Sequence, residues 1–215
     1  MTLALGVIGS LIVLMVKPSK GLVVFFASMV WYPTANTFQI ATLDFSVSRF
    51  VCCVLFIKVM TNQKLIHGFK ISTIDKFMTA YFIGQIVAGT FTTDFGLLII
   101  NRSGFFFDVF MPFLIIRVLI VDSVSLDQFL KSILFITAPL ALMAIAEAIL
   151  DRNFLLFGRA EPFIYPRWGM KRAMTTFSHP IYFGVFMSLV FGLGISIWPK
   201  LSKIPGKLFV IIVLI

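Results

Sequence analysis

The 215-residue chain is too apolar for a soluble domain of its length, with 60% hydrophobic residues, 13% charged residues and a mean hydropathy of +1.04. A bilayer core about 30 Å thick is crossed by roughly 20 apolar helical residues, so the chain has room for about seven or eight spans. The apolar runs are continuous, which favours helices over a barrel. We therefore predict an all-α polytopic bundle of transmembrane helices that forms a single domain over residues 1–215.

Seven spans are predicted, with a truncated eighth. The seven are Met1–Val16, Gly21–Leu43, Phe45–Met60, Phe77–Thr93, Phe105–Val121, Phe129–Leu150 and Pro180–Pro199. A turn is expected at Asn101–Gly104, between the fourth and fifth spans. The last apolar run, Leu208–Ile215, is too short to cross a membrane, so we expect the sequence to be a fragment of a longer protein.

The basic residues are unevenly divided between the two sides of the predicted bundle. One set of alternate connections is rich in lysine, and the opposite set is rich in arginine. The lysine-rich set is the larger, so the rule that cytoplasmic connections gather basic residues places it inside. The long connection 151–178 is then extracytoplasmic. It combines basic and aromatic residues with prolines, which predicts a segment lying in the outer interface.

The end of this connection carries an ordered set of residues. Arg172, Thr176-Phe177, His179-Pro180 and Gly184 follow one another at the loop-to-helix junction. This order resembles the pattern at the entrance to a transmembrane helix in the O-antigen ligase and O-antigen polymerase family of bacterial membrane glycosyltransferases. The resemblance covers roughly Phe45–Gly194, and its strongest part is about a dozen residues long.

The resemblance implies a reaction at the outer face of the bacterial cytoplasmic membrane. A glycan would pass from a polyprenyl-diphosphate carrier to an acceptor glycan or lipid, without a nucleotide sugar, a required metal or another cofactor. It also implies further spans and a second external loop that carries functional residues. The expected partners are these glycans, membrane lipids and other proteins of polysaccharide assembly, and no nucleic acid partner is expected.

Arginine at this junction suits a diphosphate, because a guanidinium binds phosphate oxygens bidentately and stabilises the charge of a leaving group. Arg172 is the first candidate for catalysis and for binding the lipid diphosphate, followed by Arg167 and Arg159. The alternative is that these arginines contact ordinary headgroups. His179 is a candidate general base for the acceptor hydroxyl, although a histidine that caps the following helix is the favoured interpretation.

Other polar residues are assigned structural roles. We expect Glu147 to pair with Arg152 or with an arginine of the long connection, and Asp108 and Arg117 to reach opposite interfaces. Adjacent cysteines at positions 52 and 53 point about 100° apart and form neither a metal site nor a mutual disulfide.

Two functions from different classes follow from the sequence. The favoured one is a membrane glycosyltransferase of surface-polysaccharide assembly, either an O-antigen or exopolysaccharide polymerase or a ligase. The alternative is a non-enzymatic polytopic protein such as a transporter or a lipid flippase subunit. Transporters often carry charged or broken helices near the middle of the membrane, and the predicted spans lack such charges.

Overall fold

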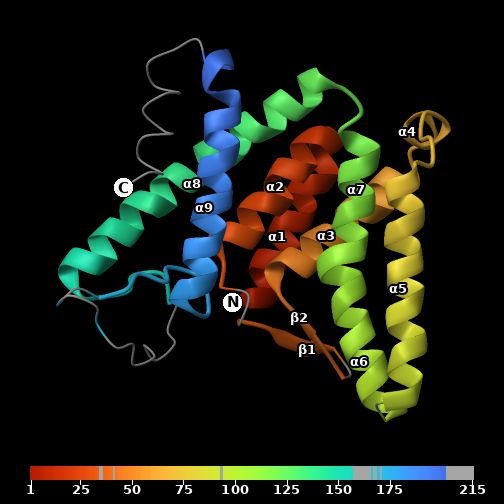
Figure 1. Ribbon diagram of the computed structural model, residues 1–215, viewed down its shortest axis with the longest axis horizontal. Coiled ribbons are helices and arrows are strands. Elements are labelled where there is room, and N and C mark those ends of the chain that lie inside the picture. The colour runs from red at the N-terminus through yellow and green to blue at the C-terminus, as the bar shows by residue number, and fades with distance from the viewer. Residues whose placement is uncertain are drawn as a thin grey trace. The chain divides into compact units, whose positions relative to one another are not determined.

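The computed structural model describes residues 1–33, 36–40, 42–92, 94–156, 166, 169 and 171–201. In this part the chain is mostly helical, with two short strands (Figure 1). The elements are α1 (Thr2–Met15), α2 (Pro18–Trp31), β1 (Phe38–Ile40), β2 (Leu43–Phe45), α3 (Val47–Met60), α4 (Gln63–His67), α5 (Thr73–Thr92), α6 (Phe95–Phe105), the π-helical turn η1 (Phe106–Phe110), α7 (Met111–Leu119), α8 (Ser123–Leu150), α9 (Pro180–Ile197) and the 3-10 turn η2 (Trp198–Lys200).

Three helices in the described part are long and apolar enough to cross a membrane. They cover Phe95–Leu119, Ser123–Leu150 and Pro180–Lys200, with 25, 28 and 21 residues. The helices α1 and α2 are also apolar, but each has 14 residues. At a rise of about 1.5 Å per residue they are shorter than the hydrocarbon core. The all-α class is confirmed, whereas the count of seven spans is not, and the eighth run lies outside the described residues.

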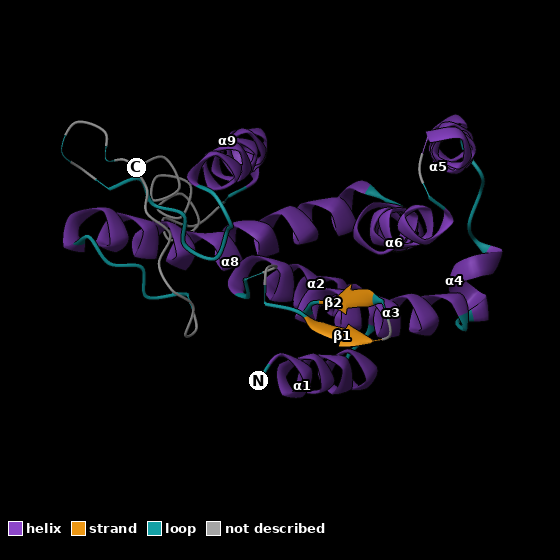
Figure 2. Cartoon of the chain, turned by 90° about the horizontal axis from the view of Figure 1, so that it is seen from below, coloured by secondary structure: helices purple, strands orange, loops and turns teal. Residues whose placement is uncertain are grey.

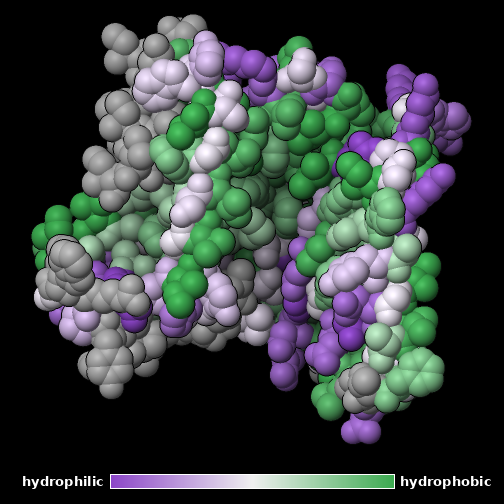
Figure 3. Space-filling view, viewed as in Figure 1, coloured by the Kyte–Doolittle hydropathy of each residue, from purple (hydrophilic) through white to green (hydrophobic). Residues whose placement is uncertain are grey.

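The surface agrees with a membrane environment. Large apolar side chains are exposed along several helices, including Phe77 at 72% and Phe91 at 84% in α5. Apolar side chains cover much of the face drawn in Figure 3, while hydrophilic ones gather around α4. Water does not solvate so many large apolar side chains on a stable monomer, so these helices indicate a membrane protein.

Two sequence-based expectations are corrected. The turn expected at Asn101–Gly104 is wrong, because α6 continues through these residues into η1 and α7. The span expected at Gly21–Leu43 is too long, because α2 ends at Trp31, two residues before Pro33. The chain then forms the antiparallel hairpin of β1 and β2, in which Phe38 pairs with Phe45 (Figure 2).

The chain divides into two compact units. Unit 1 comprises Met1–Phe25 and Thr37–Val121, and unit 2 comprises Phe26–Asn36 and Asp122–Ile215. In unit 1, α1 packs closely on α3 because Gly9 leaves room for Val51, whose Cγ2 would lie 2.7 Å from an added Cβ.

In unit 2, the packing of α8 against α9 creates the core that supports the end of α8. Ile133 and Leu134 of α8 form a buried cluster with Val190 of α9. A second cluster joins Leu140 of α8 to Phe183 of α9. These contacts fix the C-terminal end of α8 beside the start of α9. The connection between the two helices contains the site residues predicted from the sequence, Arg159, Arg167, Arg172 and His179.

Candidate functional site

A buried carboxylate lies at the C-terminal end of α8. Glu147 is only 1% exposed. Its Oε2 accepts a hydrogen bond from the Thr175 amide at 2.9 Å, and its Oε1 accepts one from the Met174 amide at 3.3 Å. Asn153 adds a side-chain hydrogen bond. A buried carboxylate requires such partners, and here the main chain supplies two of them.

Residues 171–179, named here the junction segment, are held at further points. The Asn153 amide group donates to the Thr175 carbonyl at 2.8 Å, and its oxygen accepts from the Leu155 amide at 2.8 Å. The Thr176 hydroxyl donates to the Val30 carbonyl at 2.6 Å. The segment is therefore fixed by α8, by the residues that follow α8, and by α2.

Thr175 has a backbone conformation that is unusual for its residue type. Its φ of 51° lies in the left-handed region, which a β-branched residue rarely adopts. Its hydroxyl oxygen is buried and has no hydrogen-bond partner among the described residues. Backbone strain and unpartnered buried polar atoms both concentrate at functional sites, so Thr175 marks this segment as a candidate.

Arg172 precedes this strained residue by three positions and is half-buried. Its Nε is buried without a hydrogen-bond partner in the described part of the chain. The neighbouring Lys171 contacts the Asp151 carbonyl at 3.4 Å, and Arg152 lies over the Phe154 ring at 5.8 Å. A guanidinium nitrogen with unused donor capacity can bind an anionic oxygen.

His179 is the N-cap of α9. Its Nδ1 accepts a hydrogen bond from the Ile181 amide at 3.2 Å, and Pro180 occupies the first position of the helix. In the neutral ring the proton therefore resides on Nε2. The capping interpretation is confirmed. A general base needs a free ring nitrogen, which His179 provides only after it releases the helix cap.

The remaining predicted site residues, Arg159 and Arg167, lie outside the described residues. No group of three or more His, Cys, Asp or Glu side chains in the described part could hold a metal ion. Cys52 and Cys53 are unpaired thiols.

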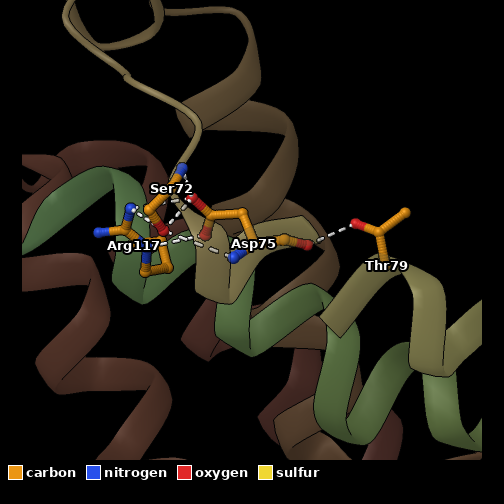
Figure 4. A network of polar contacts seen from close by, with 4 residues as sticks. All are labelled: Ser72, Asp75, Thr79 and Arg117. Atoms are coloured by element: carbon orange, nitrogen blue, oxygen red, sulfur yellow. Dashed lines mark hydrogen bonds and ion pairs between the residues drawn. The ribbon is translucent and has the colours of Figure 1, made fainter. Parts of the chain in front are cut away.

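Sequence reasoning missed a polar network in unit 1 (Figure 4). Arg117 of α7 binds Asp75 at the start of α5 through two bonds, Nε to Oδ1 at 2.8 Å and Nη2 to Oδ2 at 2.9 Å. Ser72 donates to the same carboxylate from its amide and hydroxyl groups, and the Phe69 ring lies 5.6 Å from the guanidinium carbon. The Arg117 hydrogen bond holds the pKa of Asp75 well below its usual range.

A second pair joins α3 to η1. Arg49 donates from Nε to Asp108 Oδ1 at 2.7 Å and from Nη2 to Oδ2. Arg49 also donates to the Asp44 carbonyl. The expectation that Asp108 and Arg117 each reach their own interface is therefore replaced by two ion pairs between helices. The available signal was the complementary charge of Arg49, on another predicted span, and of Asp75, two residues before the span predicted at Phe77–Thr93.

Lys58 of α3 binds the C-terminal end of α1. Its Nζ donates to the carbonyls of Val13 and Leu14 at 2.8 Å each, and to that of Val16. These carbonyls have no partner within their own helix, and their dipoles attract a cation.

We compared the chain with known proteins. No protein-family model, no curated protein and no solved structure matches the chain.

Proposed function

We propose that this chain belongs to a membrane glycosyltransferase of surface-polysaccharide assembly, a polymerase or ligase, in which Arg172 binds the diphosphate of a polyprenyl-linked glycan. The observation that carries the proposal is the buried Nε of Arg172, which has no partner among the described residues. It lies in a segment fixed by Glu147 and Asn153. The residue as a whole is half-buried, and a guanidinium with unused donors can bind the oxygens of a diphosphate.

In this proposal the arginine acts on the leaving group. When the bond between the sugar and the diphosphate breaks, negative charge grows on the phosphate oxygen, and a guanidinium already in place stabilises it. Lys171, the residue before Arg172, adds positive charge next to it in the chain. His179 is given the capping role, because its Nδ1 is used by the Ile181 amide.

The location follows from the same chemistry. The three long apolar helices support the assignment to a membrane. We place it in the bacterial cytoplasmic membrane with residues 151–178 outside, where polyprenyl-linked glycans are consumed. A topology reporter fused within this connection should respond on the outer side, and a cytoplasmic response would contradict the placement.

The test replaces Arg172 in the complete protein. Arg172→Ala and Arg172→Lys should each reduce transfer from a synthetic polyprenyl-diphosphate glycan by about 100-fold or more, because lysine cannot reproduce the bidentate fork. Arg152→Ala is the matched control, since this arginine lies in the same connection and contacts an aromatic ring. Normal transfer by Arg172→Ala at wild-type membrane levels would refute the proposal.

One observation favours the second candidate, a transporter or flippase subunit. Asp108 lies near the middle of the continuous helix Phe95–Leu119, in its π-helical turn, and pairs with Arg49. Charged residues and interrupted helices at this depth are typical of transport pathways. Purified protein in vesicles that moves a fluorescent polyprenyl diphosphate between leaflets, and loses this movement in Asp108→Asn, would support this function over the enzyme.

A further inference from the structure

Glu147 is the most deeply buried acidic side chain of the described residues, and the proposed reaction does not use it directly. Its side chain is 1% exposed and both carboxylate oxygens are occupied by main-chain amides. A general base or a cation ligand needs an accessible oxygen, so these direct roles do not fit. The carboxylate acts on the backbone of the junction segment.

That backbone includes the left-handed Thr175. Its φ of 51° is unfavourable for a β-branched residue and persists only where the surroundings enforce it. The bond from its amide to Glu147 is the shorter of the two amide bonds, at 2.9 Å, and Asn153 holds its carbonyl at 2.8 Å. Both peptide groups of Thr175 are thus fixed from the end of α8 and the residues after it.

The two amides that Glu147 binds lie two and three residues after Arg172. We infer that Glu147 is a positioning residue, which sets the path of the junction segment and so holds the Arg172 guanidinium in place for the diphosphate. This inference rests on the proposed function. Orientation matters most when charge develops on the leaving group, so the loss of Glu147 should lower kcat more than it raises KM.

Hydrogen exchange tests the two amide bonds to Glu147 independently of activity. In the complete protein, the amides of Met174 and Thr175 should exchange slowly, and Glu147→Ala should accelerate both because their acceptor is gone. Glu147→Gln keeps one carbonyl oxygen and should retain part of the protection. Unchanged exchange in Glu147→Ala would overturn the inference. Size-exclusion elution in detergent checks that each variant is folded.

The kinetic test follows transfer from a synthetic polyprenyl-diphosphate glycan. A misplaced catalytic group can cost about 100-fold, so we expect a fall in kcat of this order for Glu147→Ala with KM changed by less than about threefold. Arg172→Ala, measured in the same assay, distinguishes failure of the proposed function from failure of positioning by Glu147. If Arg172→Ala is inactive and Glu147→Ala turns over normally, positioning by Glu147 is overturned while the proposed function stands.

A second substitution provides rescue. Glycine adopts a left-handed backbone without penalty, so Thr175→Gly reduces the need for the carboxylate. The double variant Glu147→Ala/Thr175→Gly should recover part of the kcat that Glu147→Ala loses. A double variant as impaired as Glu147→Ala would contradict the role assigned to the strained backbone. Full activity of Arg172→Ala would overturn the proposed function and the inference with it, while the exchange data would still show whether Glu147 holds the segment.

Discussion

In the described part of the chain, the most buried acid of unit 1, Asp75, is paired with an arginine, whereas the most buried acid of unit 2, Glu147, is held by main-chain amides. In unit 1, Asp75 and Asp108 each bind an arginine from another helix in bidentate fashion. In unit 2, Glu147 binds main-chain amides, and the Nε of Arg172 has no partner among the described residues. An arginine that binds a carboxylate bidentately has its charge compensated and one face of its guanidinium occupied, whereas an arginine without such a partner keeps that face for a phosphate. By this comparison Arg49 and Arg117 are structural, and Arg172 is the candidate ligand.

The sharpest way to test this comparison is to remove one arginine of each kind. Arg172→Ala should reduce glycan transfer by about 100- to 1,000-fold, the range found when one preorganised donor is lost, and leave the detergent Tm unchanged. Arg117→Ala should lower the Tm because Asp75 is left buried without its cation. Thermal unfolding followed by circular dichroism measures both. An equal fall in Tm for the two variants would break the comparison.

Lys58→Met tests the contribution of the lysine of unit 1 that binds the carbonyls at the end of α1. The three carbonyls at the end of α1 lose a charged donor while the methionine keeps the aliphatic packing. We expect a destabilisation of about 1.5–3 kcal/mol. Lys64→Met in α4 is the control, since this lysine is exposed. Denaturant unfolding in mixed micelles gives the free energies, and equal values for the two variants would show that the carbonyl contacts contribute nothing.

Two glycines of α5 differ in how closely neighbouring side chains approach them, and we expect alanine to have opposite effects on stability at the two positions. A Cβ at Gly89 would lie 2.2 Å from Leu98 Cδ1 and 3.3 Å from Arg102 Nε, whereas one at Gly84 would meet nothing within 4 Å. Gly89→Ala should therefore cost about 1–3 kcal/mol through overpacking. Gly84→Ala should stabilise the helix by up to about 1 kcal/mol. The same unfolding assay measures both, and a stabilising Gly89→Ala would mean that α5 and α6 do not approach so closely.

Acidification should weaken the Asp75–Arg117 pair. Because the pKa of Asp75 is lowered in the folded protein, its contribution to stability is complete above the ordinary carboxyl pKa of about 3.9. It is lost as the pH falls below that value toward the lowered one. We expect the Tm of the wild type to drop more steeply in this window than that of Asp75→Asn. Parallel Tm profiles for the two proteins would contradict the assignment.

The sequence predicted the helical class and several helix boundaries for local reasons. The start of α9 at Pro180 was predictable because proline favours the first turn and His179 can cap it. The end of α8 at Leu150 was also predicted, since Asp151 follows an apolar run. These features depend on neighbouring residues only.

Features that depend on distant residues were not predictable. The turn expected at Asn101–Gly104 is helical, and Gly104 instead leaves the Arg49 guanidinium 3.5 Å from the position of an added Cβ. In an apolar environment a helix satisfies its own backbone groups, which outweighs the turn preference of single residues. In the candidate site, Arg172 and the His179 cap were found by sequence, whereas the contact of Glu147 with residues 27 and 28 positions away was not.

The π-helical turn at Phe106–Phe110 changes the direction in which the following residues point from the helix axis. Such a wide turn accommodates one residue more than an α-helical turn, and each residue of an α-helix corresponds to a rotation of about 100°. Deleting one residue between Asp108 and Met111 would restore an uninterrupted α-helical repeat and turn the following residues around the axis. Arg117 would then face away from Asp75, while Asp108 kept its place beside Arg49. The inserted residue thus lets one helix satisfy two ion pairs on different sides.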